Sequence, residues 1–478
     1  MRSKAIRGIL IAGALSALSG GAWWWQRATT AQRVVSAALP LAPAAGTRPA
    51  VWRDQFVAAE AEAHSLFQAR RGLAKLSRLY HANGFLTEAL RCYEGLELLE
   101  PAAPRWPHLH ASILAGYGEV EAAMALWQRV GQLAPEFLPA QLRLGDCQLK
   151  SNRPAEAAAT YTAVLHREPR NPYALLGLAR LDFEAQRWDQ AQARLESVVE
   201  QSNYTLGYDL IVTLYEHTGQ PERANAIRGA SKASGAFRDP PDAWLDDLMD
   251  VCFDPYRLAL TAGFLARNGD PAQAVLLLER AIAYAPTDVP TRFQLGTLSV
   301  TQGNFSVARE QLEQCTRLAP DFADGWAHLS ALQEQLGETS AAAQTLTTGL
   351  SRCPASPGLH LMRARRSRQA GAIEQSIADY RESIRLRPTE AEAFIELAYL
   401  LIKLGNSNEA VRLLQQSLVA EPANPLALST LTFHAILSGD QAAALHWFAQ
   451  VRHQPRVPPE EVGKLRAAFQ ERFGRPVR

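Results

Sequence analysis

Apolar and small residues recur along most of this chain with a step of 34 residues. The segment 255–456 shows the pattern most regularly. Glycine stands at the same point of each step at Gly269, Gly303, Gly337, Gly371, Gly405 and Gly439. Proline keeps the same step at Pro286, Pro320, Pro354, Pro388 and Pro422. Two series locked to one period predict a repeat architecture, and a period of this length predicts a helix–turn–helix unit.

The unit that begins at Ala323 explains the spacing. Trp326 and Leu329 are three residues apart and therefore share one face of a first helix. Gly337 follows as the stop, because the left-handed backbone at a helix C-terminus suits glycine. Apolar positions three or four residues apart then predict a second helix. Pro354 closes this helix, since proline lacks the amide hydrogen and disfavours helical geometry in the preceding residue.

These units resemble the tetratricopeptide repeat family. The matching motifs are Leu144-Gly145, Leu295-Gly296, Trp326-x-x-Leu329, Ala89-x-x-x-Tyr93 and Ala157-x-x-x-Tyr161. The resemblance implies an all-α, right-handed α-solenoid of about eleven helix pairs. It also implies that the first helices of the pairs line a groove for a protein or peptide partner.

The repeats divide the chain into consecutive parts. We expect a capping helix and a first array over 51–238, an inserted helix over 239–254, a second array over 255–456 and a C-terminal capping helix over 457–478. Within the insertion, Asp246, Asp247, Asp250 and Asp254 lack the glycine and the closing glutamate of a calcium loop. We therefore expect a helix packed across the joint between the arrays, with its acids facing water.

The N-terminus has the pattern of a membrane segment. Arg2, Lys4 and Arg7 precede an uncharged run from Gly8 to Trp25 that ends in three tryptophans. A helix of this length spans roughly 27 Å, and tryptophan suits the membrane interface. We predict a signal anchor over 1–26, with the repeats outside the cytoplasm, in a bacterial periplasm. A cleaved signal peptide that releases the chain is the alternative. Residues 27–50 are expected to be an Ala/Pro-rich linker, with a semi-extended spacer over residues 37–49.

Composition and motifs narrow the function. Lys and Arg number 49 against 48 Asp and Glu, so net charge indicates no nucleic-acid partner. The five cysteines and the dispersed histidines form no metal-binding spacing, and we expect no metal and no cofactor. The nucleotide-binding, zinc-protease and serine-hydrolase motifs are missing from the sequence. We therefore expect no enzymatic activity.

Positions carried over from the resemblance give the candidate groove. The residues are Arg180, Phe293, Arg365, Arg368, Tyr399 and Phe433. Arg365 and Arg368 are three residues apart on one helical face, and arginine suits carboxylate or phosphate groups. The alternative is a solvated basic face. Arg363 stands where other units place leucine, which needs a cause. The family's carboxylate clamp of lysines and asparagines has no counterpart here.

The sequence thus predicts a membrane-anchored, non-enzymatic scaffold outside the cytoplasm that binds a partner protein or peptide. Two alternatives stay open. One is an exported soluble adaptor subunit of a secretion or envelope-assembly complex. The other is a glycan-binding or catalytic role in the groove.

Overall fold

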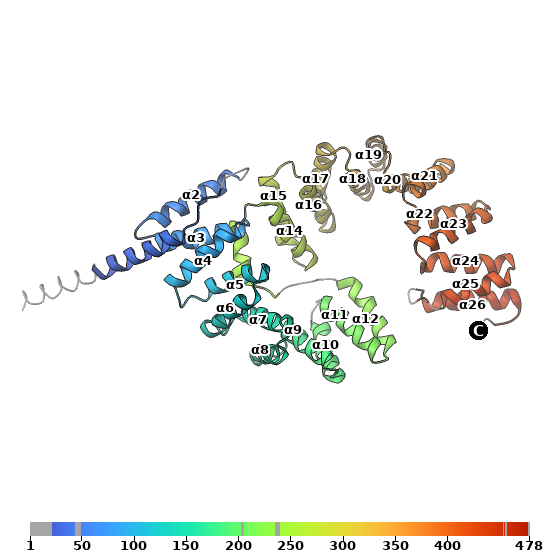
Figure 1. Cartoon of the computed structure of the whole chain (residues 1–478). Coiled ribbons are helices and arrows are strands. Elements are labelled where there is room, and N and C mark those ends of the chain that lie inside the picture. The colour runs from blue at the N-terminus through green and yellow to red at the C-terminus, as the bar shows by residue number, and fades with distance from the viewer. Residues whose placement is uncertain are drawn as a thin grey trace, which may run out of the picture. The chain divides into compact units, whose positions relative to one another are not determined.

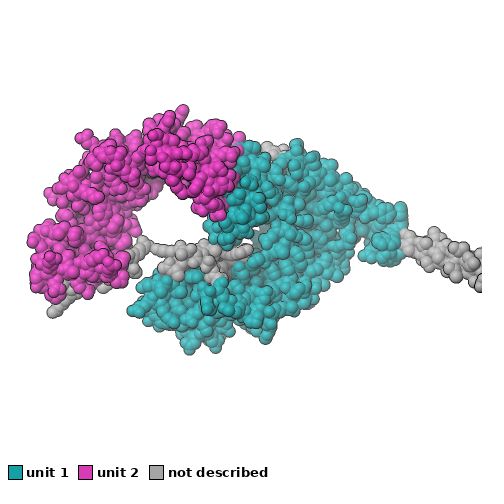
Figure 2. All heavy atoms as spheres, turned by 180° about the vertical axis from the view of Figure 1, so that it is seen from behind, with its two compact units in different colours: residues 1–286 teal, residues 287–478 magenta. Residues whose placement is uncertain are grey.

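The computed structural model describes residues 22–43, 49–201, 205–234, 240–452, 454 and 457–476, and these form helices and loops without a strand. They group into two compact units, residues 1–286 and 287–478 (Figure 2). Figure 1 shows the helices of each unit stacked in chain order. The all-helical repeat fold predicted from the sequence is confirmed, with eleven helix pairs among the described residues.

Unit 1 contains an N-terminal helix over residues 22–38, α2 (Ala50–His64) and six helix pairs. The pairs are α3 (Ala69–Ala82) with α4 (Leu86–Leu99), α5 (Arg105–Gly116) with α6 (Val120–Leu133), α7 (Leu138–Lys150) with α8 (Pro154–Arg167), α9 (Pro172–Glu184) with α10 (Trp188–Gln201), α11 (Thr205–His217) with α12 (Pro221–Ser234), and α14 (Pro255–Arg267) with α15 (Pro271–Tyr284). Two short helices, α13 (Ala243–Asp246) and the 3-10 helix η1 (Asp247–Val251), precede the last pair.

Unit 2 contains five helix pairs and a closing helix. They are α16 (Val289–Thr301) with α17 (Phe305–Leu318), α18 (Ala323–Gln335) with α19 (Thr339–Arg352), α20 (Pro357–Gln369) with α21 (Ile373–Leu386), α22 (Ala391–Lys403) with α23 (Ser407–Ala420), α24 (Pro425–Ser438) with α25 (Gln441–Val451), and α26 (Pro459–Phe473).

Glycine makes the turn inside most pairs. The backbone is left-handed at Gly337, with φ of 78°, and at the equivalent glycines of the other regular units. Small residues also let neighbouring helices approach. A Cβ atom added to Gly145 or Gly177 would come within 2.7 Å or 2.4 Å of the Tyr161 ring, which is fully buried. The repeated Leu-Gly step therefore reflects close packing around a large second-helix residue.

The predicted linker over 27–50 is wrong for residues 27–38, which are helical. Val35 is fully buried, and a Cβ atom on Gly95 would come within 2.5 Å of Ala38, so this helix packs closely on α4. The Gln32 amide also donates to the carbonyls of Ala63 and His64, at the open C-terminal end of α2. Packing on α2 and α4 thus holds residues 27–38 in a helix, and of the Ala/Pro-rich run only Ala37 and Ala38 lie in it.

Residues 1–21, which hold most of the predicted membrane segment, lie outside the described residues. Among the helices that the structure does describe, none combines the length and the apolarity needed to cross a membrane. At the opposite end of the chain, α26 buries Leu465 and Phe469 against the last repeat.

The predicted inserted helix is present as α13 and η1, which pack against α3 and α5. The two compact units divide after Pro286, one helix pair later than the interruption in the repeats. The α14–α15 pair groups with unit 1 in part because of Arg280 on α15. Its guanidinium donates hydrogen bonds to the carbonyls of Met249 and Cys252, both at 3.0 Å, and so connects this pair to the residues of the insertion.

Candidate partner-binding surface

The arginines predicted on α20 already have partners within unit 2. The Arg365 guanidinium bonds Glu396 of α22 through two nitrogens, with Nη2 2.7 Å from Oε1, and also pairs with Glu392. Arg368 lies 3.9 Å from the second Glu396 oxygen. Tyr380 donates its hydroxyl to the same carboxylate at 2.8 Å. The two arginines therefore brace α20 against α22, and their charge is largely balanced within the fold.

The pKa of Glu396 reflects this arrangement. Burial alone would raise its pKa, but the hydrogen bonds from Arg365 and Tyr380 offset the burial and lower it below the usual value. Glu396 is therefore ionised at neutral pH, and it holds both arginines from the neighbouring first helix.

Arg363 pairs with a buried carboxylate. Its Nε and Nη2 atoms lie 2.7 Å and 2.6 Å from the two oxygens of Asp379 on α21. Asp379 is 2% exposed and also receives bonds from Gln375 and His360. Burial opposes ionisation of Asp379, but these donors lower its pKa overall. An arginine occupies the leucine slot because the facing helix presents an acid there.

An open apolar hollow lies at the C-terminal end of unit 2. It has a volume of about 330 Å³ and lies between α22, α24 and the start of α26. Its apolar lining comprises Tyr399, Ile402, Leu426, Phe433 and Leu437. Leu426, Phe433 and Leu437 are 50%, 47% and 63% exposed, and their spacing places them on one face of α24. The structure thus brings two predicted groove residues, Tyr399 and Phe433, to one hollow.

An acidic hollow of about 620 Å³ adjoins the apolar one through Leu426 and reaches from α22 to α24. It is lined by Glu390, Glu392, Glu396 and Glu421. Arg365 balances part of this charge through Glu392 and Glu396. The first-helix face of unit 2 therefore presents aromatic and aliphatic side chains beside a row of carboxylates.

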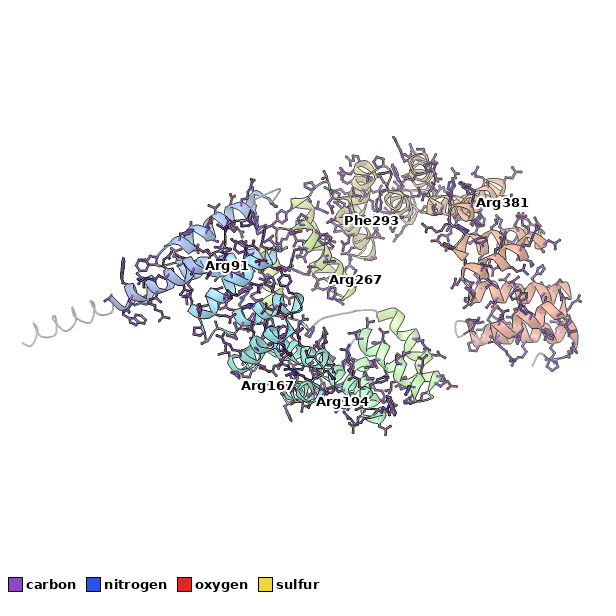
Figure 3. All side chains as sticks on the ribbon, viewed as in Figure 1. Arg91, Arg167, Arg194, Arg267, Phe293 and Arg381 are labelled. Carbon is purple, nitrogen blue, oxygen red and sulfur yellow. The ribbon has the colours of Figure 1, made fainter. Side chains whose placement is uncertain are left out.

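The other two predicted residues lie elsewhere. Phe293 lies on α16 (Figure 3). Its ring packs edge-on against Phe322 and His328, with ring centroids 5.1 Å and 4.8 Å away. Arg180 belongs to unit 1, on α9. There its positive charge acts on the phenol of Tyr161, which donates to Asp146 at 2.6 Å. Neither residue lines the apolar hollow.

In unit 1 the first helices α3 and α5 contact the chain's own residues 240–254, here called the inserted segment. The central contact is buried. Trp127 donates its indole hydrogen to His108 Nδ1 at 3.2 Å, and His108 Nε2 lies 2.8 Å from Asp242 Oδ2. Because Nδ1 accepts, Nε2 carries the hydrogen that Asp242 receives. The Trp244 ring stacks on Phe137, with centroids 3.6 Å apart.

Backbone atoms of the inserted segment are also recognised. Asn83, 1% exposed at the end of α3, donates to the Val251 carbonyl at 2.8 Å and accepts from the Phe253 amide at 2.7 Å. Arg78 donates to the Asp247 carbonyl at 2.9 Å. A side-chain amide that hydrogen-bonds one backbone carbonyl and one backbone N–H recognises the main chain of the bound segment, as in peptide recognition.

The acids Asp246, Asp247 and Asp250 of the inserted segment are exposed, as expected, whereas Asp254 is half-buried. Asp242 is 4% exposed and caps the N-terminus of α13, and Asp254 caps α14. Asp247 lies 3.2 Å from Arg105. Sequence reasoning missed Asn83, because an asparagine beside a turn glycine has the pattern of an ordinary helix stop. Among the described residues, no cluster of three or more His, Cys, Asp or Glu is suited to a metal ion.

Two profiles described as tetratricopeptide repeat match the chain, one over residues 148–204 and 265–327 and the other over residues 318–460. The sequence is also 22% identical over 445 residues to the cellulose synthase 2 operon protein C of Komagataeibacter xylinus, an alignment that covers 80% of this chain and 32% of that protein. The cellulose synthase 1 operon protein C of the same organism is 28% identical over 176 residues, 34% of this chain and 13% of that protein. This chain therefore spans about a third or less of the length of these relatives.

Similar solved structures include yeast Tom70, with 13% identity and a TM-score of 0.39 over 84% of this chain and 96% of Tom70. Another is YrrB, described as a TPR protein with an unusual peptide-binding site, with 15% identity and a TM-score of 0.29 over 37% of this chain and 90% of YrrB. The two repeat profiles together cover residues 148–204 and 265–460, more than half of the sequence. The chain belongs to the tetratricopeptide repeat family.

Proposed function

We propose that this chain is a non-enzymatic scaffold that binds a segment of a partner protein on the first-helix face of unit 2. The observation that carries the proposal is the open hollow lined by Tyr399, Phe433 and Leu437. Large exposed side chains that converge on one concavity are typical of binding sites, and aromatic anchors supply most of the affinity at such sites.

The two adjoining hollows define the chemistry of the partner segment. An apolar side chain of the partner fills the hollow beside Phe433. A lysine or arginine of the same segment approaches the rim of the adjoining acidic hollow, where Glu390 also pairs with the exposed Arg387 and Glu421 also accepts a hydrogen bond from Asn424. We therefore propose an amphipathic, basic segment as the ligand. In this proposal Arg365 and Arg368 hold Glu396 in place at the acidic hollow and do not contact the partner.

We also propose that the N-terminal segment anchors the chain in a membrane, with the repeats in the bacterial periplasm. The support is the sequence: basic residues at the start, an uncharged run from Gly8 to Trp25, and tryptophans at its far end. Catalysis is not part of the proposal, because the sequence has no recognisable catalytic motif.

The test is crosslinked capture from native membranes with a tag at the C-terminus, followed by mass spectrometry. Phe433→Asp places a charge in the apolar hollow at a side chain that is 47% exposed. Val419→Asp is the matched control, since Val419 is 85% exposed on the second helix α23. We expect one envelope protein to be captured by the wild type and by Val419→Asp and to be lost with Phe433→Asp.

Equal capture by the two variants would contradict the site. If the wild type enriches no protein, the glycan-binding alternative is favoured over the scaffold. Charge reversal of Arg365 is a poorer probe, because the new acid would repel Glu396 and disturb the lining of the acidic hollow.

The second candidate function is an exported adaptor subunit of a complex that makes or exports a polysaccharide. It is favoured by the similarity to the cellulose synthase operon proteins. Alkaline extraction of membranes separates the two proposals. An anchored scaffold stays with the bilayer, whereas a cleaved adaptor is released.

A further inference from the structure

An exposed aromatic patch surrounds the start of the described chain. Of the ten tryptophans of the sequence, all of which the structure describes, only Trp23, Trp24 and Trp25 are exposed, by 53%, 64% and 59%. Phe67, in the connection between α2 and α3, is 70% exposed, and Leu98, near the end of α4, is 74% exposed. We call Trp23–Trp25, Phe67 and Leu98 the aromatic collar.

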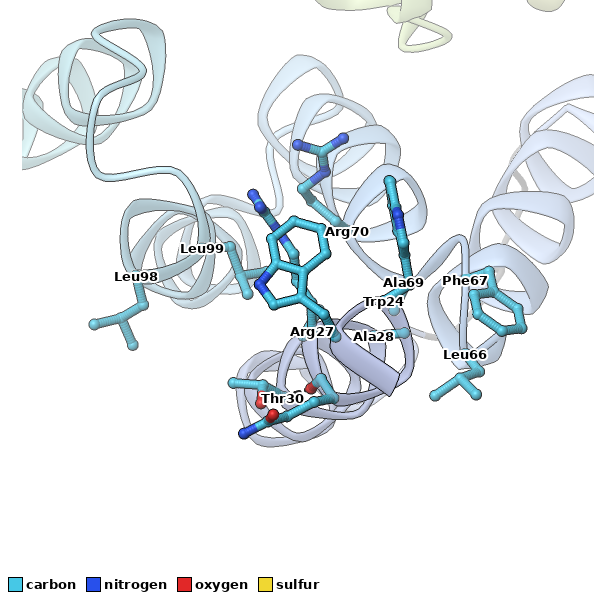
Figure 4. A pocket seen from close by; sticks show the side chains of 13 residues that line it. Trp24, Arg27, Ala28, Thr30, Leu66, Phe67, Ala69, Arg70, Leu98 and Leu99 are labelled. Carbon is cyan, nitrogen blue, oxygen red and sulfur yellow. Dashed lines mark hydrogen bonds between the residues drawn. The ribbon is translucent and has the colours of Figure 1, made fainter. Parts of the chain in front are cut away.

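Three separate parts of unit 1 bring the collar together. Trp23 and Trp24 on the N-terminal helix, Phe67 before α3, and Leu98 at the end of α4 line one hollow of about 930 Å³ (Figure 4). The Trp25 ring lies 6.3 Å from the Phe67 ring. The N-terminal helix is fixed to the repeats by Val35 and Gln32, as described above. The collar therefore belongs to the folded part of unit 1, where the N-terminal helix and the α2–α3 connection meet the end of α4.

The directions of the tryptophans indicate the kind of partner. Consecutive residues of an α-helix point about 100° apart, so Trp23–Trp25 span about 200° of the helix circumference, more than a single face. A protein partner covers one face of a helix, whereas a bilayer interface surrounds it. Tryptophan also prefers that interface, where its ring is partly apolar and its N–H stays hydrated.

Charge and chain order favour the same partner. Arg27 is exposed, and its guanidinium lies 5.2 Å from the centroid of the Trp23 ring. Arg70 borders the same hollow and pairs with Glu100. Arginine beside aromatic rings matches lipid phosphate above acyl chains. The uncharged run that begins at Gly8 leads directly into the collar.

We propose that the aromatic collar seats the first repeats of unit 1 in the headgroup layer of an anionic membrane, with Arg27 on lipid phosphate. This inference rests on the proposed membrane anchor and goes beyond it. A semi-extended linker would hold the repeats away from the bilayer, whereas the helix over residues 22–38 brings α3 and α4 to the bilayer surface.

The experiment uses the full chain in phosphatidylcholine vesicles, with and without phosphatidylglycerol. A fluorophore is attached at Phe67→Cys or Leu98→Cys, and at Val419→Cys on unit 2 as a control whose native side chain is even more exposed. The background carries Cys353→Ser, because the four other native cysteines are buried. Spin-labelled lipids then report contact with the bilayer by quenching, and flotation reports whether the chain is attached to the vesicles.

We expect vesicle-bound chains to lose most of their fluorescence at positions 67 and 98 and little at 419. Bound chains without quenching at 67 and 98 would overturn the collar and leave the anchor intact. Chains that fail to float would overturn both proposals. A different result is that the fluorophores at positions 67 and 98 become shielded from solvent as protein concentration rises, without quenching by spin-labelled lipid. That result would assign the collar to a second copy of the chain and overturn the lipid proposal.

The role of Arg27 is tested with Arg27→Gln in the same assay. We expect quenching at Leu98→Cys to increase when phosphatidylglycerol is added to the wild-type chain, and this increase to be lost in the variant. An increase of the same size in the variant would contradict the contact between Arg27 and phosphate.

Discussion

Unit 1 and unit 2 are built from the same helix pairs but differ in what covers their first helices. In unit 1, α3 and α5 contact the chain's own inserted segment, and Asp242 reaches the fully buried His108. In unit 2, α22 and α24 leave Phe433 nearly half exposed in an open hollow. The same repeat surface can thus be filled within the chain or left free for a partner.

The two faces also use different chemistry. The face of unit 1 binds its occupant through buried polar groups, such as Asn83, which contacts two main-chain atoms. The face of unit 2 carries exposed apolar side chains and carboxylates, with its arginines already paired. Buried polar contacts require a fixed and complementary occupant, whereas exposed apolar anchors suit an exchangeable ligand.

At neutral pH, the largest effect on this comparison is expected from Asp242→Ala. The change leaves the N–H of the buried His108 unpaired and removes the cap of α13. We expect a loss of about 3 kcal/mol in the stability of unit 1 and faster amide exchange over the inserted segment. Hydrogen–deuterium exchange with mass spectrometry measures both units in one sample.

The control for this change is Asp250→Ala, since Asp250 is an exposed acid of the same segment. Unit 2 should exchange as in the wild type in both variants. Unchanged exchange over residues 240–254 in Asp242→Ala would mean that the inserted segment is held without this contact.

The regular turns could be predicted from the sequence, because each depends on local backbone geometry. Gly337 and its equivalents are left-handed as expected. The contacts of Asn83 could not be predicted, since they join residues 168 and 170 positions apart. Arg363 shows an intermediate case. The repeat register marks it as a departure, but its cause, Asp379, belongs to a different helix and appears only when the helices are packed.

The candidate site was predictable to a similar extent. Repeat position placed Tyr399 and Phe433 on the face that holds the apolar hollow. The same reasoning could not show that Arg365 is paired, because Glu396 lies 31 residues away on the next first helix. The spacing of residues along one helix indicates which side chains share its exposed face. It does not indicate which charged side chains of neighbouring units form ion pairs.

The stability of unit 1 is also expected to depend on pH. Burial, together with the nearby positive charge of Arg257 and with His108, lowers the pKa of His81 to about 3. The unfolded chain takes up a proton at this residue below about pH 6.5, but the folded chain stays neutral there until about pH 3. Above about pH 6.5, His81 is neutral in both states, and its contribution to the free energy of unfolding does not change with pH. Below that pH, the contribution falls by about 1.4 kcal/mol per pH unit as the pH drops toward the folded pKa.

Urea denaturation of the wild type and of His81→Gln at successive pH values measures this contribution. Glutamine keeps a polar group near the Tyr93 hydroxyl, which lies 3.0 Å from His81 Nδ1. We expect the wild type to lose more stability than the variant as the pH falls. Parallel curves would show that His81 becomes protonated in the folded state at an ordinary pH.

The smallest expected effect concerns the turns within the pairs. Unit 2 places glycine at the left-handed turn inside each of its five pairs, whereas unit 1 places Asn152 and Gln186 at two of its turns, both with φ of 57°. A left-handed backbone costs a residue other than glycine about 1 kcal/mol, and asparagine less. Gln186→Gly should therefore stabilise unit 1 by up to about 1 kcal/mol. Asn152→Gly should give a smaller gain.

The reciprocal change is Gly337→Gln in unit 2. No atom lies within 4 Å of a Cβ atom added at Gly337, so the substitution adds backbone strain without a clash. We expect a loss of about the size that Gln186→Gly gains. Thermal denaturation of the two variants measures both. A pair of shifts with the same sign would show that packing around these turns, and not the left-handed backbone, sets the cost in each unit.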